Sequence, residues 1–175
     1  MKRHTNDAGI PTLEIALAEY MSAEDLRSLA ALTGKKLPTR KPDLAAVIVR
    51  HLEGEGLRAA WQSLDEIQRA AVAEVVHSNS GKFLADLFRA KYGRDPLWVT
   101  TDASGYRRRP TPLGLFFYGA GEMPADLNQR LGTFVPRPSK AQITTLAELT
   151  ATCEVQRENG KKAVPLTLHR NDGPT

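Results

Sequence analysis

The chain is poor in cysteine, in aromatic residues and in long hydrophobic runs. Cys153 is the only cysteine among 175 residues, which excludes an intrachain disulfide and a thiolate metal site built from this chain alone. Aromatic residues make up 6%, so we expect a core of leucine, alanine and valine. The apolar stretch near the N-terminus is interrupted by Pro11, Glu14 and Glu19, and no segment approaches transmembrane length. We therefore expect a soluble cytoplasmic protein with no membrane partner.

Motifs for catalysis and for metal binding are equally scarce. The 4 histidines show no zinc-ligand spacing, and neither an HExxH nor a GxSxG motif occurs. The "NSGKF" stretch does not form a phosphate loop, because Val76 stands where the first glycine is required and Phe83 where Ser or Thr is required. No pair of acidic residues stands out for general acid and base work. The sequence therefore predicts a protein that is not an enzyme, with no cofactor and no metal.

The hydrophobic pattern that is present predicts a mainly α-helical fold. A capping-box pattern at Ser22 predicts a helix whose apolar residues recur up to Gly34, and glycine suits a helix end in the left-handed conformation. Pro42 suits the first turn of a second helix, and "LRAAW" predicts a short third one. Ser63 and Glu66 form another capping-box pattern, which predicts the start of a further helix.

The second half of the chain predicts shorter elements. "KFLADLFRAKYG" is typical of a helix with Phe83, Leu84, Leu87 and Phe88 on one face. "LWVTT", "DASG" and "YRRR" predict one β-hairpin, and short helices are expected at "LGLFFYG" and after Pro124. Beyond this point the pattern loosens and contains one strand-like run, "AVPLTLH". We assign the chain to a first helical module (1–60), a second helical unit (61–136) and a linker or tail (137–175).

Basic residues gather in the loop between the first two helices. The net charge of +4 and the pI of about 9.3 mildly favour acidic partners. Lys35, Lys36, Arg40 and Lys41 lie in this loop and approach the helix that begins near Pro42, where free N–H groups and the helix dipole favour an anion. This arrangement predicts a phosphate site that holds a nucleic-acid backbone without reading bases. The alternative is a solvated connector whose charges only keep the loop soluble.

Two further basic clusters are candidates for the same interface. Arg107, Arg108 and Arg109 lie at the predicted hairpin, and the forked donors of arginine suit phosphate. Tyr106 beside them could stack on a base, although a tyrosine there is more often packed. The other cluster lies opposite the apolar stripe of its helix, which is also the usual arrangement of a solvated helix face. It comprises Lys82, Arg89 and Lys91.

Residues 22–52 resemble a SAP-type helix–loop–helix, a module found in DNA-binding proteins. The matching positions are Leu26, Leu29, Gly34, Lys41, Leu44, Val47, Ile48 and Leu52. Thr39 stands where SAP modules usually carry glycine. In that family the loop and the start of the second helix contact the DNA backbone, so the resemblance implicates the four basic residues of the loop.

The segments "LDEIQRAAVAEVVHSNSGKFLADLFRAKYG" and "LGLFFYGAGEMPADLNQRLGTFVP" are similar to segments that accompany SAP-like modules in large bacterial helicase-associated proteins. There they form winged-helix-like units. The two resemblances imply a small helical SAP-like hairpin followed by a winged-helix-like unit with one β-hairpin. They also imply a DNA-binding accessory, on duplex or single-stranded DNA, of a helicase-type enzyme in bacterial defence or DNA repair. None of the helicase ATP-binding motifs occurs in this chain.

The alternative function is a protein-interaction adaptor that docks on a larger assembly through apolar helices. An exposed run of Leu115, Phe116, Phe117 and Tyr118 would support it, because monomers rarely leave such patches in water. The other interpretation of this run is that it forms the core of the second unit.

Overall fold

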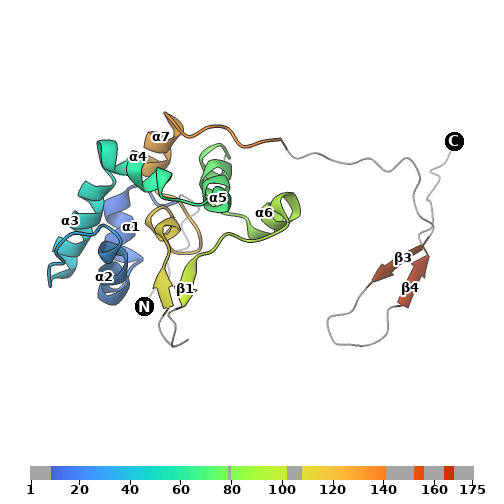
Figure 1. Cartoon of the computed structure of the whole chain (residues 1–175), viewed down its shortest axis with the longest axis horizontal. Coiled ribbons are helices and arrows are strands. Elements are labelled where there is room, and N and C mark those ends of the chain that lie inside the picture. Colours follow the sequence, from blue (N-terminus) through green and yellow to red (C-terminus); the bar gives the residue numbers. More distant parts are fainter. Residues whose placement is uncertain (1–8, 79, 102–107, 141–151, 156–163, 168–175) are drawn as a thin grey trace. The chain divides into compact units, whose positions relative to one another are not determined.

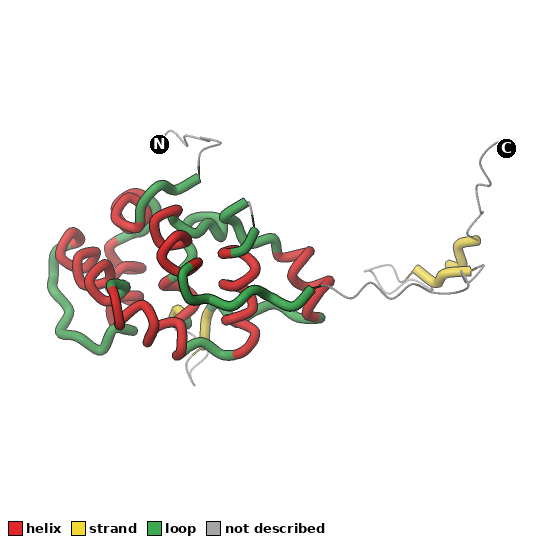
Figure 2. The backbone as a smooth tube through the Cα atoms, turned by 90° about the horizontal axis from the view of Figure 1, so that it is seen from above, coloured by secondary structure: helices red, strands yellow, loops and turns green. Residues whose placement is uncertain are grey.

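The computed structural model describes residues 9–78, 80–101, 108–140, 152–155 and 164–167 (Figure 1). The chain divides into two compact units, Met1–Ser139 and Lys140–Thr175. Helices linked by loops make up most of the first unit (Figure 2). They are α1 (Leu13–Glu19), α2 (Ala23–Ala31), α3 (Lys41–His51), α4 (Gly54–Gln62), α5 (Glu66–Val76), α6 (Ala85–Tyr92), a short 3-10 helix (Pro112–Leu115) and α7 (Ala125–Gly132). The predicted mainly α-helical fold is confirmed.

Helix α1 was not among the predicted helices. The side chain of Thr12 caps it by accepting a hydrogen bond from the Ile15 backbone N–H at 3.3 Å. Leu13 and Leu17 are fully buried on its inner face. Pro11 precedes the cap, so the proline that interrupts the apolar stretch in the sequence does not interrupt the helix.

Helices α2 and α3 begin where the sequence predicts, but α2 ends at Ala31, three residues before the predicted Gly34. The hydroxyl of Ser22 accepts a hydrogen bond from the backbone N–H of Asp25 at 3.1 Å, as expected for an N-cap. Gly34 follows α2 with a φ of 67°, a left-handed conformation that favours glycine. Pro42 lies in the first turn of α3, as predicted.

Contacts at their ends show how α1, α2 and α3 run. The Lys41 ammonium, at the start of α3, donates to the carbonyl of Ala18 at the end of α1, so these two helices are antiparallel. Only residues 20–22 connect α1 to α2, so α2 starts at the same end of the bundle as α3 and packs against it. Helices α2 and α3 therefore run in the same direction, and the loop between them must return along the pair.

The capping box of α5 lies two residues later than predicted. Asp65 is the N-cap: its carboxylate accepts from the Gln68 backbone N–H at 2.8 Å, and the Gln68 side chain accepts from the Asp65 N–H at 3.3 Å. Ser63 instead ends α4, where its hydroxyl donates to the carbonyl of Ala60 at 2.8 Å. Gln68 is buried and also donates to the Leu97 carbonyl at 2.8 Å, which fixes the box at this register.

One hydrophobic core extends through the first unit. It joins leucines of α1, α2 and α3 to residues of α5, the 3-10 helix and α7, so the predicted modules 1–60 and 61–136 share it. The run from Leu115 to Tyr118 belongs to this core, with exposed fractions between 0% and 6%. The Tyr118 hydroxyl donates to the Leu115 carbonyl at 2.9 Å.

Aromatic rings fill the space beside α6 and the predicted β-hairpin. Phe83 contacts Phe88, Trp98 and Phe117, with ring centroids 5.1, 5.2 and 6.1 Å away. Strands β1 (Val99–Thr101) and β2 (Arg108–Pro110) pair in antiparallel fashion, which confirms the hairpin. The predicted apolar face of α6 is buried only in part. Within the helix only Phe88 is buried, whereas Leu87 is 67% exposed.

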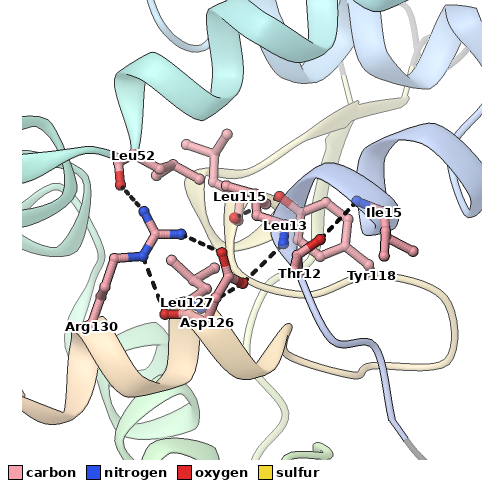
Figure 3. Close-up of polar contacts among 9 residues, drawn as sticks. All are labelled: Thr12, Leu13, Ile15, Leu52, Leu115, Tyr118, Asp126, Leu127 and Arg130. Carbon is pink, nitrogen blue, oxygen red and sulfur yellow. Dashed lines mark hydrogen bonds and ion pairs between the residues drawn. The ribbon is translucent and has the colours of Figure 1, made fainter.

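An ion pair on α7 connects the two ends of the first unit's chain (Figure 3). Asp126 accepts hydrogen bonds from the backbone N–H of Leu13 at 2.9 Å and of Leu127 at 2.8 Å. Arg130 donates to the Asp126 carboxylate at 2.9 Å and to the Leu52 carbonyl at 3.1 Å. The pair therefore caps the N-terminus of α1 and the C-terminal end of α3 together.

The second unit contains a two-stranded antiparallel sheet of β3 (Thr152–Val155) and β4 (Val164–Thr167). Strand β4 falls within the run that the sequence marks as strand-like, and β3 was not predicted. Thr152 lies opposite Thr167, and Val155 lies opposite Val164.

Candidate nucleic-acid interface

The structure places the four basic residues of the α2–α3 loop at two ends of the helix pair. Lys35 and Lys36 follow the end of α2, whereas Arg40 and Lys41 stand at the start of α3. Because α2 and α3 run in the same direction, the loop extends back along the helix pair from the first two of these residues to the other two. Lys36 and Arg40 are four residues apart, so their Cα atoms lie at most about 14 Å from each other. The loop residues form two separate basic ends and not one compact cluster.

The first basic end lies where α2 and α3 finish, and we call it the Lys35 end. Lys35 and Lys36 are exposed there, and His51, the last residue of α3, is half-buried. The pKa of His51 is lowered, first by burial and second by the positive charge of Lys35. The Lys35 ammonium therefore acts on the imidazole of His51, although 16 residues separate them in sequence.

The second basic end lies where α3 begins, and we call it the Arg40 end. Arg40 is the N-cap of α3 and is exposed, and no side chain caps the free N–H groups of this helix. Arg27 of α2 joins this end, with its guanidinium 3.5 Å from the carbonyl oxygen of Thr39. Lys41 contributes less, because its ammonium donates to the Ala18 carbonyl at 2.7 Å. Asp43 in the first turn of α3 lowers the positive potential of this end.

The arginines of the hairpin are only partly within the described residues. Arg109 is exposed on β2, opposite Thr100, whose hydroxyl donates to the Arg109 carbonyl at 3.4 Å. Arg108 lies on the same strand opposite Thr101. Tyr106 and Arg107 lie outside the described residues.

The third predicted cluster consists of cations that already have acidic partners. The Lys91 ammonium lies 2.5 Å from a carboxylate oxygen of Glu74, and desolvation of Lys91 is outweighed by this contact, so its pKa is raised. Arg89 pairs with Asp95 at 2.5 Å, and this hydrogen bond raises the pKa of the guanidinium. Lys82 lies 3.6 Å from Glu122. A phosphate would have to compete with a carboxylate at each of these positions.

Two residues that lie at these basic ends, Arg27 and His51, were absent from the sequence-based prediction. The position of each residue in the sequence indicates its role only once the direction of the helices is known. Arg27 lies in the second turn of α2 and contacts the returning loop. His51 stands at the end of α3, where a cation is favoured by the helix dipole.

No metal centre and no spanning helix are found within the described ranges. No three His, Cys, Asp or Glu side chains there are grouped so that they could hold a metal ion. None of the helices there combines the length and the hydrophobicity needed to cross a membrane. Comparison with protein-family models, curated proteins and solved structures finds no match to this chain.

Proposed function

We propose that the chain is a non-enzymatic DNA-binding module that holds the phosphate backbone along the α2–α3 pair. One observation carries this proposal. Arg27, Lys35, Lys36 and Arg40 are exposed and have no acidic partner within the described part of the chain, whereas Lys82, Arg89 and Lys91 are paired with carboxylates. Exposed unpaired cations can release counterions from a nucleic acid, and paired cations offer less. The SAP-type resemblance of residues 22–52 supports the same function.

Binding of this kind follows the backbone and not the base sequence. Contacts to phosphate fix the position of a protein on DNA but carry no sequence information directly. We therefore expect similar affinity for unrelated duplex sequences and a strong dependence on salt. An accessory role beside a helicase-type enzyme in DNA repair or bacterial defence fits such a module, and it belongs to the proposal.

The test is a fluorescence anisotropy titration of labelled duplex and single strand at about 50 mM and about 200 mM salt. The variant Lys35→Ala with Arg40→Ala removes one cation from each end of the pair. We expect its salt slope on duplex DNA to be shallower by about 1.8, because each phosphate contact contributes about 0.9. The affinity near 0.1 M salt should fall roughly 10- to 100-fold for all sequences tested.

A matched control keeps the net charge of that variant. Arg69→Ala with Arg94→Ala also removes two exposed arginines, which lie outside α2, α3 and their loop. The proposal expects this control to bind nearly as the unchanged protein does. If the two double variants lose the same affinity, binding depends on net charge alone. An unchanged slope in the Lys35 and Arg40 variant would contradict the proposed site.

Surface features of α6 and α3 favour a second candidate function, a docking adaptor. The run Leu115 to Tyr118, which would have supported this function if exposed, is buried in the core. Leu84 and Leu87 instead leave apolar surface at α6, 47% and 67% exposed. A groove of about 390 Å³ between α1 and α3 has an apolar part formed by three alanines, a valine and a proline, and a charged part formed by Glu14, Arg50 and Glu53. The absence of salt-sensitive DNA binding in the same titrations would favour this candidate.

A further inference from the structure

The Lys35 end contains a titratable residue beside its two lysines. His51 ends α3, and Lys35 lies four residues beyond the end of α2, which finishes at the same end of the helix pair. The imidazole is half-buried and so keeps part of its surface in contact with solvent. These placements bring Lys35 and His51 to one end of the candidate interface, and Lys36 is the next residue of the loop.

Charged groups from each neighbouring element lie near this end of α3. On α3 itself the preceding residue is Arg50, which lines the groove toward α1 with Glu14 and Glu53. Helix α4 begins next to His51 and carries Glu55 in its first turn. From α7, Arg130 reaches the Leu52 carbonyl but is also paired with Asp126. Helix α2 has no basic residue in its last turn.

Among these groups it is Lys35 whose charge acts on the imidazole. Burial and this charge lower the pKa of His51 below its ordinary value of about 6.5, so the ring is neutral at pH 7 in the free protein. A phosphate held by Lys35 and Lys36 would reverse the second effect, because a nearby negative charge favours the imidazolium.

We propose that His51 is a third cation of the Lys35 end, which takes up a proton when a nucleic-acid phosphate binds there, so that affinity increases as the pH falls. This inference rests on the proposed function. Proton uptake and phosphate binding favour each other by the same factor, as linkage requires. Phosphodiesters stay charged throughout the range in which histidine titrates, so the protein is the source of any change.

The experiment compares the full-length protein with His51→Gln and His51→Arg. Each is titrated with labelled duplex at about pH 5.5 and about pH 8, on either side of the ordinary histidine pKa. Glutamine at position 51 is polar and neutral at both pH values, and arginine there is positively charged at both. The remaining histidines are unchanged in all three proteins, so any pH effect that they cause is common to them. Circular dichroism at both pH values verifies that each variant is folded.

We expect the unchanged protein to bind about two- to fivefold more tightly at the lower pH, the range of one partly exposed ion pair. Its salt slope should steepen by up to about 0.9 there, because one more phosphate is neutralised. Apart from any pH effect that all three proteins share, His51→Gln should bind at both pH values as the unchanged protein does near pH 8. On the same basis, His51→Arg should bind at both as tightly as the unchanged protein does near pH 5.5.

The outcomes separate this inference from the function on which it rests. Salt-dependent binding whose pH dependence is the same in the unchanged protein and in His51→Gln would overturn the role of His51 and leave the DNA-binding function intact. A His51→Arg protein whose affinity rises in acid by as much as that of the unchanged protein would overturn it as well. No salt-dependent binding at either pH would overturn the proposed function itself.

Discussion

The ion pair of Asp126 and Arg130 provides the sharpest test of how the first unit is held together. In Asp126→Ala, the Leu13 N–H loses its acceptor at 2.9 Å and Arg130 loses its partner at 2.9 Å. Loss of a helix N-cap costs about 1 kcal/mol, and the half-exposed ion pair adds roughly 0.5 kcal/mol. The Leu127 N–H loses its acceptor too, which should lower the free energy of unfolding by about 0.5 kcal/mol more. We therefore expect the free energy of unfolding to fall by about 2 kcal/mol.

A series of substitutions separates the geometry of this pair from its charge. Asp126→Asn keeps an oxygen that accepts from Leu13, so it should cost only about 0.5–1 kcal/mol. Arg130→Ala removes the bond to the Leu52 carbonyl at 3.1 Å and should cost about 1–1.5 kcal/mol. The double variant should lose about 0.5 kcal/mol less than the sum of the Asp126→Ala and Arg130→Ala losses, because the two side chains contact each other.

The assay is urea unfolding followed by the fluorescence of Trp61 and Trp98, which are both half-buried. Asp86→Ala is the matched control, since the Asp86 side chain is 99% exposed and lies 3.8 Å from Arg89. It should change the free energy of unfolding by less than about 0.5 kcal/mol. The reasoning fails if Asp126→Asn costs as much as Asp126→Ala, because the accepted hydrogen bond would then not be what stabilises α1.

Three further variants test other parts of the structure. Lys82→Ala with Lys91→Ala should leave the salt slope of DNA binding unchanged, because carboxylates already neutralise both lysines. A shallower slope in the same titration would show that these lysines contact phosphate. Tyr118→Phe should lower the free energy of unfolding in urea by about 1–2 kcal/mol, since its buried hydroxyl donates a hydrogen bond. Burial raises the pKa of Tyr118, so the folded protein keeps the hydroxyl proton above about pH 10, where tyrosine in the unfolded chain loses it. The free energy of unfolding should therefore fall as the pH rises above about 10, and it should fall less in Tyr118→Phe. Gly93→Ala should cost about 1 kcal/mol in thermal unfolding, because Gly93 ends α6 with a φ of 75°, and no loss would mean that the helix end can rearrange.

Local signals in the sequence predict most helices of the first unit. The N-cap at Ser22, the left-handed Gly34 and the proline that starts α3 all act within a few residues, so they can be read without knowledge of the fold. The capping box of α5 shows the limit of such signals. Ser63 with Glu66 and Asp65 with Gln68 both fit the pattern, and the long-range bond from Gln68 to the Leu97 carbonyl accompanies the second.

The arrangement of the basic residues was harder to predict, because a count of charges does not show the direction in which the helices run. Lys35 and Arg40 are five positions apart in the sequence, but they lie at opposite ends of α3 because the loop returns along parallel helices. The same limit applies to α6. Its apolar spacing predicts one apolar face, but whether another element covers Leu87 depends on residues distant in the chain. Sequence spacing therefore indicates which side chains share a face and not what lies opposite that face.

The contact between α7 and the start of α1 also constrains the order in which the protein can fold during synthesis. The Ala125 N–H donates to the Ile10 carbonyl at 2.9 Å, and Asp126 accepts from Leu13, so α1 is completed by α7, which is translated much later. More than a hundred residues must leave the ribosome before these bonds can form. Until then α1 lacks a tertiary cap and α3 lacks the donor at its C-terminal end. The contacts between α7 and the start of α1 therefore form late and close a long loop of the chain, which slows folding.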